Sequence, residues 1–318
     1  MPINLEIEFT EMFSDYRCFF CFSRSFEKMI EKLELSPAEK GTLAGKMFRL
    51  FGEGESGFSV PDLSRDLYAL VREYSGNRDP YKQIKRQSND QVLSIYPDLK
   101  KMIQKSDNPF ETALRLAIAG NIIDYGIFDQ YDLEGTIEKV LHADYAINHA
   151  AELKQSLSKA KTVLYLGDNA GEIVFDKLFM ETIMHPNIWY AVRGAPVIND
   201  ATMEDARYVH LDEVADIIEN GYDAPSTIPE RCSKEFNDLY AQADVIISKG
   251  QGNLEGLIEQ TGKKIFFLLM VKCEVIADVL GVKKGDFVVA ENSQVTGIRD
   301  FQDENGRVFF HERPDCFR

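Results

Sequence analysis

The sequence lacks several features that assign proteins to common classes. Its longest purely apolar run, 265–271, has seven residues, whereas a membrane-spanning helix needs roughly 20. Basic residues are in the minority, 36 against 52 acidic ones, and the net charge is −16. Most of the surface would therefore repel a polyanion. We expect no nucleic acid and no membrane among the partners, and because the start of the chain is acidic rather than basic we expect no leader peptide and a cytoplasmic location.

Cysteine is also scarce. Five cysteines, an odd number, are scattered along a chain that is large enough to fold without disulfides, so we expect free thiols. Cys18 and Cys21 form a Cys-x-x-Cys pair, but no second pair has the spacing of a four-ligand zinc site, and core packing is the favoured interpretation. The five histidines show neither HxxxH nor HExxH spacing, and we assign them no catalytic role.

What the sequence does contain is enough apolar material for a large core: 318 residues, 44% of them hydrophobic. From about residue 24 to 160, apolar residues recur at intervals of three and four, which predicts helices. Ser36-Pro37 and Asn108-Pro109 each place a cap residue and a first-turn proline at the start of a helix.

From Lys161 the pattern changes to short apolar runs, each followed by a polar or glycine-containing loop and a helical segment. Nearly continuous apolar runs are typical of parallel strands that are covered on both faces. We predict a three-layer α/β/α sandwich with a mostly parallel sheet, plus an N-terminal helical layer. The predicted domains are 1–160 (helical), 161–292 (α/β core) and 293–318 (an accessory tail with a turn at 303–306), and the predicted strands are 162–166, 188–192, 244–248, 264–270 and 287–290.

Ligands of such sheets bind at the carboxyl ends of the strands, and the loop after the first predicted strand carries suitable residues. Asp168 and Asn169 offer oxygen ligands for a divalent cation, and the helix that begins near Glu172 offers backbone N–H groups to an anion. A helix cap, with Asn169 three residues before Glu172, explains this loop about equally well.

The loop after the second predicted strand contains Arg193 and Asp200. The guanidinium fork of an arginine suits phosphate oxygens, and the carboxylate of Asp200 could complete a cation site that begins at Asp168. A turn that caps the next helix is the alternative for this loop taken alone.

The loop after the third predicted strand reads Lys249-Gly250-Gln251-Gly252-Asn253. Gly250 and Gly252 would let the backbone approach an anion, and Lys249 adds a positive charge. The loop has neither Walker nor GxGxxG spacing, and a flexible turn is the alternative. Together, the three loops provide what metal-assisted phosphoryl transfer requires, a cation site opposite positive charges. No Asp-x-Asp follows the first strand, so attack by water is preferred to an aspartyl-phosphate intermediate.

These segments resemble the damage-control phosphatase family. The resemblance lies in 168–176, 193–200 and 249–253, and extends to 79–81, 108–110, 120–126 and 272–274. It therefore covers nearly the whole chain except the tail, and Cys18 and Cys21 match a pair found in the short prokaryotic members.

The resemblance implies a metal-dependent phosphatase that acts on small phosphorylated metabolites, such as sugar phosphates, nucleotides or damaged cofactor intermediates. It places the metal on Asp168, Asn169 and Asp200, and the phosphate on Lys249, with Glu172 and Asn253 lining the pocket. Asn121 and Asp124, in a matching motif, could reach the sugar end of a substrate. The expected metals are Mg²⁺, Mn²⁺, Co²⁺ or Ni²⁺, because oxygen ligands disfavour zinc.

Two alternatives remain open at this point. One is an S-adenosylmethionine-dependent carboxyl methyltransferase, an activity that has also been attached to this family and that needs no metal. The other is a sensor that binds a phosphorylated metabolite without turning it over, because the sequence shows cation and anion sites more clearly than a general base. The sequence does not indicate the physiological substrate, the preferred metal or the oligomeric state.

Overall fold

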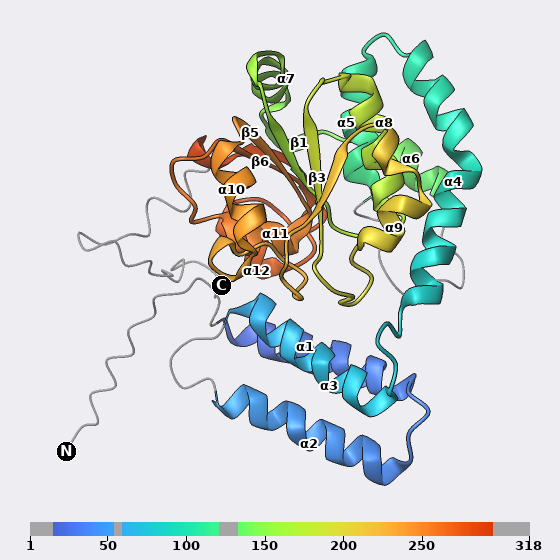
Figure 1. Ribbon diagram of the computed structural model, residues 1–318, viewed down its shortest axis with the longest axis vertical. Helices are drawn as coiled ribbons and strands as arrows, with labels where there is room; N and C mark the ends of the chain where they lie inside the picture. Colours follow the sequence, from blue (N-terminus) through green and yellow to red (C-terminus); the bar gives the residue numbers. More distant parts are fainter. Residues whose placement is uncertain (1–14, 54–58, 121–132, 295–318) are drawn as a thin grey trace, which may run out of the picture.

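The computed structural model describes residues 15–53, 59–120 and 133–294, which contain a seven-stranded sheet with helices on both faces (Figure 1). The described strands are β1 (Tyr145–Asn148), β2 (Val163–Leu166), β3 (Ile188–Val192), β4 (Asp216–Glu219), β5 (Val245–Lys249), β6 (Ile265–Met270) and β7 (Phe287–Glu291). The five predicted strands are confirmed to within one residue at each end. The sequence prediction omitted β1 and β4.

The strands are arranged in the order β1-β7-β6-β5-β2-β3-β4. All neighbours are parallel except β6 and β7, which are antiparallel, so the prediction of a mostly parallel sheet is confirmed. From β2 the chain proceeds through β3 to β4 and then returns to β5 on the other side of β2. The carboxyl ends of β2 and β5 therefore flank the point at which the order reverses, where open sheets bind their ligands.

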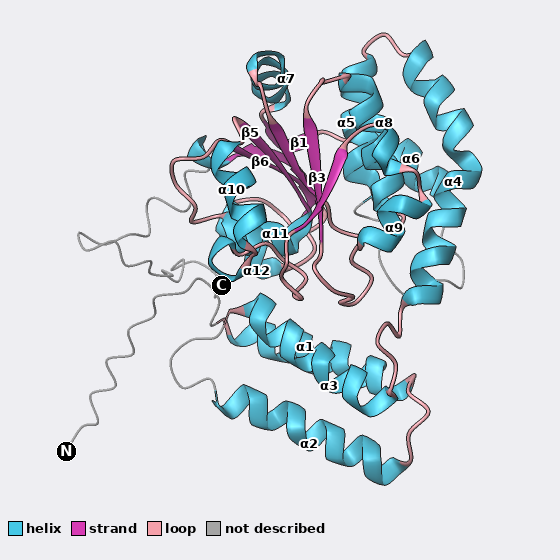
Figure 2. Cartoon of the chain, in the orientation of Figure 1, coloured by secondary structure: helices cyan, strands magenta, loops and turns pink. Residues whose placement is uncertain are grey.

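Two apolar cores lie between the sheet and its helices, which confirms the three layers (Figure 2). One core joins the sheet to α4–α9, and the other joins it to α10–α12. The helices of the first face are α4 (Lys82–Lys105), α5 (Pro109–Gly120), α6 (Leu133–His142), α7 (Ala150–Lys159), α8 (Glu172–Ile183) and α9 (Met203–Tyr208); those of the second are α10 (Lys234–Gln242), α11 (Gly250–Leu257) and α12 (Glu274–Leu280).

The first three helices, α1 (Tyr16–Glu31), α2 (Pro37–Glu53) and α3 (Val60–Ser75), have a core of their own and gather at one end of the molecule (Figure 1). The predicted helix starts at Pro37 and Pro109 are confirmed. At the start of α2, Ser36 and Glu39 form a capping box, in which the Ser36 N–H and hydroxyl both donate to the Glu39 carboxylate (2.8 and 2.6 Å). The division into domains at residue 160 stays a prediction.

The helical body α1–α3 is attached to loops at the carboxyl edge of the sheet. Arg72 of α3 donates from Nη1 to the carbonyl oxygen of Pro196 (2.8 Å), in the loop after β3. Tyr68, one turn earlier, packs against Val197 of the same loop. The Tyr222 hydroxyl, after β4, donates to Asp62. The helices therefore lie next to the loops that were predicted to carry the chemistry.

The remaining sequence predictions concern membrane-spanning helices, the cysteines and residues that the structure does not describe. In the described part, no helix is long and apolar enough to cross a membrane, and the four cysteines there are free thiols, as expected. Cys18 is half-buried against the core that lies beneath α10–α12, whereas Cys21 is exposed, so the prediction of core packing is wrong for Cys21. Asn121, Asp124 and the predicted turn of the tail lie outside the described residues.

Candidate active site

The loops after β2 and β3 are joined through their backbones. The Ala201 N–H donates to the carbonyl oxygen of Asp168 (2.8 Å), and Asn169 pairs with Asp200 as an isolated antiparallel bridge. All three predicted metal ligands, Asp168, Asn169 and Asp200, are buried. The structure thus brings these three residues together at the carboxyl ends of β2 and β3. Backbone hydrogen bonds between the two loops fix their separation.

The turn from β2 into α8 depends on Gly171. Its φ of +80° is a conformation that side-chain-bearing residues rarely adopt, and a Cβ atom there would lie 3.1 Å from the Cβ of Ser88 on α4. The Gly171 N–H donates to Oδ1 of Asn89, also on α4 (2.6 Å). Glu172 then begins α8 with its side chain fully buried.

Arg193 lies between the two candidate metal-binding carboxylates. Its Nε donates to Oδ2 of Asp200 (2.6 Å), and its Nη2 donates to Oδ1 of Asp168 (3.4 Å). Nη1 donates to Oδ1 of Asn253 (2.8 Å) and to the Thr227 hydroxyl (3.3 Å). Loop position predicted that Arg193 binds phosphate, and this stays a prediction; in the structure, four of the five N–H donor positions of Arg193 have protein partners.

Negative charge is concentrated around Asp168. Burial raises the pKa of the Asp168 carboxyl well above its usual range, and the charges of Glu172 and Asp200 raise it further. The positive charges of Arg193 and Lys272 act against this rise in pKa. A carboxyl whose ionisation is opposed by its neighbours is one that a bound cation would stabilise in the ionised form.

The total charge of the buried cluster supports the same conclusion. Six charged side chains are buried around the ends of β2, β3 and β5, and if all are ionised the four carboxylates and two cations leave a charge of −2. One divalent cation would balance it. The six are Asp168, Glu172, Asp176, Asp200, Arg193 and Lys249.

Lys249, at the end of β5, points into the face of the sheet that α5 and α8 cover. Its ammonium group donates to Asp176 Oδ1 (2.5 Å), Glu172 Oε1 (2.7 Å) and the carbonyl oxygen of Ala117 (2.8 Å). Burial lowers the pKa of Lys249, but the carboxylates of Asp176 and Glu172 outweigh this and raise that pKa above its ordinary value. The residue that the resemblance assigns to phosphate therefore has three internal acceptors.

Asn253 connects the three loops. Its Nδ2 donates to the carbonyl oxygens of Gly167 (2.9 Å) and Lys249 (2.8 Å), and its Oδ1 accepts from Arg193 and from the Thr227 hydroxyl (2.9 Å). The two N–H donors and the oxygen of the Asn253 amide therefore all have protein partners.

The two glycines of the third loop are explained by backbone conformation and by close packing. Gly250 has a φ of +78° and begins α11. At Gly252 a Cβ atom would lie 2.1 Å from the carbonyl oxygen of Pro225. The absence of a side chain at Gly252 is thus required by the packing of the 225–227 segment on α11.

Asp168, Asn169 and Asp200 can supply two carboxylates and one amide to a metal ion. No group of three or more His, Cys, Asp or Glu side chains in the described part of the chain comes together as a metal cluster. The mixed set of oxygen ligands fits a hard divalent cation such as Mg²⁺ or Mn²⁺ better than zinc, which favours nitrogen and sulfur.

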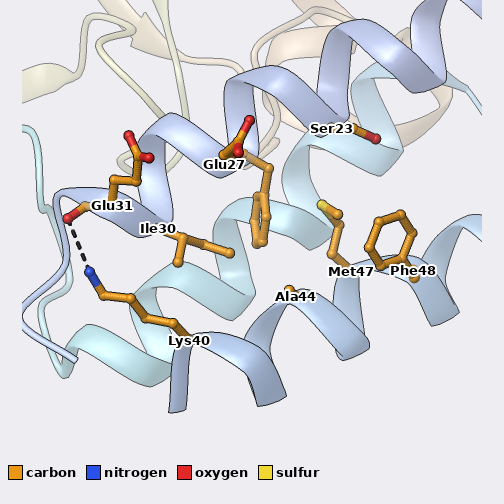
Figure 3. Close-up of a pocket in the computed structure, with 9 residues that line it drawn as sticks. Ser23, Glu27, Ile30, Glu31, Lys40, Ala44, Met47 and Phe48 are labelled. Carbon is orange, nitrogen blue, oxygen red and sulfur yellow. Dashed lines mark hydrogen bonds between the residues drawn. The ribbon is translucent and has the colours of Figure 1, made fainter. Parts of the chain in front are cut away.

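A hollow lies away from this site, in the helical body between α1 and α2 (Figure 3). It has a volume of about 440 Å³, and its lining includes Phe26, Ile30 and Met47. Lys40, at its edge, donates to the carbonyl oxygen of Glu31 (3.1 Å). None of the residues predicted for the site lines this hollow, so we place the candidate active site at the ends of the strands.

The comparison with known protein families decides the relationship of this chain. A model described as the damage-control phosphatase ARMT1-like domain matches residues 14–288. The chain belongs to this family. The damage-control phosphatase family that the sequence analysis inferred from the loop motifs is therefore confirmed.

Individual family members are similar over most of their length. A damage-control phosphatase of Pyrococcus horikoshii is 31% identical over 282 residues, which are 87% of this chain and 97% of the relative. One of Archaeoglobus fulgidus is 36% identical over 233 residues, 71% of this chain and 80% of the relative. The crystal structure of a DUF89 family protein from P. horikoshii superposes with a TM-score of 0.80 at 30% identity, covering 87% of this chain and 98% of the other.

Some residues of this family member's site were missed in the sequence. Asp176 accepts hydrogen bonds from the hydroxyls of Tyr165 (2.7 Å) and Tyr190 (2.8 Å) as well as from Lys249. The two tyrosines lie within apolar strands and Asp176 lies within an apolar helix, so the hydrophobic pattern did not single them out, although Asp176 falls in the resembling segment 168–176. Lys272, whose charge acts on Asp168, follows β6, and its position beyond a strand end was the available signal.

Proposed function

We propose that this chain is a metal-dependent phosphatase that hydrolyses small phosphorylated metabolites. The observation that carries the proposal is the pair of buried carboxylates of Asp168 and Asp200, which lie on two bridged loops and are both contacted by the Arg193 guanidinium. The names of the relatives from P. horikoshii and A. fulgidus support a phosphatase.

In this proposal, Asp168, Asn169 and Asp200 hold the metal ion. A divalent cation at such a site polarises a phosphate oxygen and lowers the pKa of a water molecule. Arg193 holds the two carboxylates at their separation. Lys249 and Arg193, whose positive charges lie in the buried cluster, would neutralise the phosphate together with the half-buried Lys272 and the N-terminus of α8.

The proposed substrates are small phosphorylated metabolites, in keeping with the relatives that are named damage-control phosphatases. The choice among sugar phosphates, nucleotides and damaged cofactor intermediates is left to the assay. We place the activity in the cytoplasm, in keeping with the free thiols at Cys18, Cys21, Cys232 and Cys273.

The first test replaces Asp168 by alanine. We expect phosphate release from a panel of sugar phosphates and nucleotides to require Mg²⁺, Mn²⁺, Co²⁺ or Ni²⁺ and to be abolished by EDTA. Asp168→Ala should lower kcat/KM by about 10³-fold or more, because it removes a metal ligand. Asp212→Ala, at an exposed aspartate of the same type, should leave kcat/KM unchanged.

Other outcomes would favour the alternatives. Retention of most activity in Asp168→Ala would contradict the assignment of the metal site. Tight binding of metal and phosphoester without any release of phosphate would favour a sensor. Transfer of a methyl group from S-adenosylmethionine to a carboxylate in the presence of EDTA would favour the methyltransferase.

A further inference from the structure

One buried hydroxyl group beside the candidate active site has no hydrogen-bond partner in the described part of the chain. It belongs to Tyr68 of α3, a residue with only 1% of its surface exposed. A buried hydroxyl without a partner is costly, and phenylalanine would fill nearly the same space without that cost. The presence of a tyrosine at this position therefore needs an explanation other than packing.

Tyr68 lies on the side of α3 that meets the loops at the carboxyl edge of the sheet. A different side of the helix packs into the core of the helical body, through Leu63, Leu67 and Val71. Tyr68 instead contacts Val197, in the loop after β3, and Tyr81, which precedes α4. The carbonyl oxygen of Val197 accepts from the N–H of Asp200 (3.1 Å). The Tyr68 ring therefore touches the turn that ends in a candidate metal ligand.

The surroundings of Tyr68 combine aromatic surface with charge. Its ring and the ring of Tyr81 have centroids 5.9 Å apart and planes at 36°. The guanidinium of Arg72 lies over the Tyr68 ring, 5.4 Å from its centroid, and also donates to the carbonyl oxygen of Pro196. The helical body and the loop after β3 thus meet around this one tyrosine.

The Tyr68 hydroxyl is a neutral hydrogen-bonding group at physiological pH. Burial raises its pKa above the ordinary value, and the charge of Asp79 raises that pKa further. A protonated phenol both donates and accepts hydrogen bonds, and the two rings offer apolar surface beside it. This combination suits the alcohol portion of a phosphate ester, in which hydroxyl and C–H groups alternate, better than the charged phosphate, which is bound by cations.

We infer that Tyr68 is a specificity-determining residue, whose hydroxyl forms a hydrogen bond with a hydroxyl group on the alcohol portion of the substrate. The inference rests on the proposed function, because it requires a phosphate ester at the loops of Asp168 and Asp200. It adds a contact from the helical body to those of the strand-end loops. Because the Tyr68 hydroxyl is covered in the structure, α3 has to separate slightly from the Val197 turn as the substrate enters.

The test removes only the hydroxyl, in the variant Tyr68→Phe of the full-length protein. Two probes are compared at saturating Mn²⁺: the sugar phosphate or nucleotide with the highest wild-type kcat/KM, and phenyl phosphate, whose alcohol portion has no free hydroxyl. We expect Tyr68→Phe to lower kcat/KM for the first probe about tenfold, because a hydrogen bond to the substrate is lost, and to change kcat/KM for phenyl phosphate less than about twofold.

Three results of this comparison would overturn the inference. One is an equal loss of kcat/KM for both probes, and another is no loss for either. The third is a wild-type protein that uses no sugar phosphate or nucleotide better than phenyl phosphate, since such a protein gains nothing from the hydroxyl groups of a substrate.

The stability of the ligand-free protein distinguishes a substrate contact from a structural role. Because the hydroxyl binds to no described residue, Tyr68→Phe should leave the midpoint of urea denaturation unchanged or raise it. Tyr240→Phe is the matched control, because Tyr240 is buried on α10 and its hydroxyl likewise has no partner among the described residues. This control should change neither the midpoint nor kcat/KM. A lower midpoint in Tyr68→Phe would show that the hydroxyl stabilises the fold, and the inference would fail.

Binding measurements keep the inference separate from the proposed function. If the wild-type protein releases no phosphate, calorimetry in the presence of Mn²⁺ replaces the assay, with inorganic phosphate and the sugar phosphate or nucleotide that binds most tightly. Tenfold weaker binding of the ester by Tyr68→Phe, at unchanged binding of inorganic phosphate, would then retain the Tyr68 contact and reject the phosphatase. Metal-dependent phosphate release that is indifferent to Tyr68→Phe would do the reverse.

Discussion

At the scale of single residues, the buried polar side chains at the ends of the strands bind mainly to one another. Asn253 shows this most clearly, since its amide makes four hydrogen bonds that join the backbones of Gly167 and Lys249 to the side chains of Arg193 and Thr227. A buried donor or acceptor that loses its partner costs about 1–3 kcal/mol. Asn253 therefore contributes to the site through the placement of Arg193.

Replacing Asn253 by alanine tests this role. Because the Arg193 guanidinium and the Gly167 carbonyl oxygen would each lose a buried partner, we expect Asn253→Ala to lower the free energy of unfolding by about 2–4 kcal/mol in urea denaturation. Asn77→Ala, at an exposed asparagine, should cost less than about 1 kcal/mol. A loss of activity in Asn253→Ala at unchanged stability would instead indicate direct contact with the substrate.

The sequence predicted which residues would meet at the site better than it predicted their partners. Asp168, Asn169 and Asp200 could be found because polar residues after neighbouring parallel strands must lie at one edge of the sheet. The direction in which a long side chain points depends on packing, and so Arg193 and Lys249 have partners that loop position did not indicate. Tyr165 could not be recognised, because a tyrosine within an apolar strand has the pattern of a core residue.

At the scale of secondary-structure elements, α4 holds the two loops that carry the candidate metal ligands. Its Asn89 is fully buried, accepts from the Gly171 N–H (2.6 Å) and donates to Oδ1 of Asp205 (3.4 Å). Asp205 in turn accepts from the backbone N–H and hydroxyl of Thr202, two residues after Asp200. One side chain of α4 thus connects the loop after β2 with the start of α9.

Removing the Asn89 side chain should increase the mobility of the loop after β2 more than that of α4. We expect Asn89→Ala to lower the free energy of unfolding by about 1–3 kcal/mol and to speed hydrogen exchange of the Gly171 amide, measured by mass spectrometry on peptides that span the turn. Ser94→Ala, at an exposed position of the same helix, is the control and should change neither. Unaltered exchange in Asn89→Ala would mean that the backbone bridge between Asn169 and Asp200 suffices to hold the turn.

The strands that the sequence predicted and those it missed differ in their place in the sheet. The predicted strands are buried along nearly their whole length, and such continuous apolar runs are visible in a sequence. The two missed strands, β1 and β4, are at the two edges of the sheet. β1 alternates between half-buried and exposed residues, and β4 begins and ends with an exposed acidic residue. An edge strand has solvent on one side and lacks the continuous apolar pattern.

At the scale of the whole molecule, two features act on any substrate. The helical body α1–α3 is attached beside the site through Tyr68, Arg72 and Asp62, so helices distant in sequence border the candidate site. The net charge of −16 surrounds that site with a field that attracts metal cations and repels phosphate esters. The two ligands of the proposed reaction therefore experience opposite long-range forces.

Salt should consequently change the two binding steps in opposite directions. Raising NaCl from about 10 to about 150 mM shortens the range of charge interactions from roughly 30 to 8 Å. We expect Mn²⁺ affinity to fall about three- to tenfold, and kcat/KM for a sugar phosphate at saturating Mn²⁺ to rise about two- to fivefold. Sucrose at matched osmolality is the control for effects that are not electrostatic. A kcat/KM that falls with salt would show that the local positive charge of Lys272 and the N-terminus of α8, rather than the charge of the whole molecule, governs the approach of the substrate.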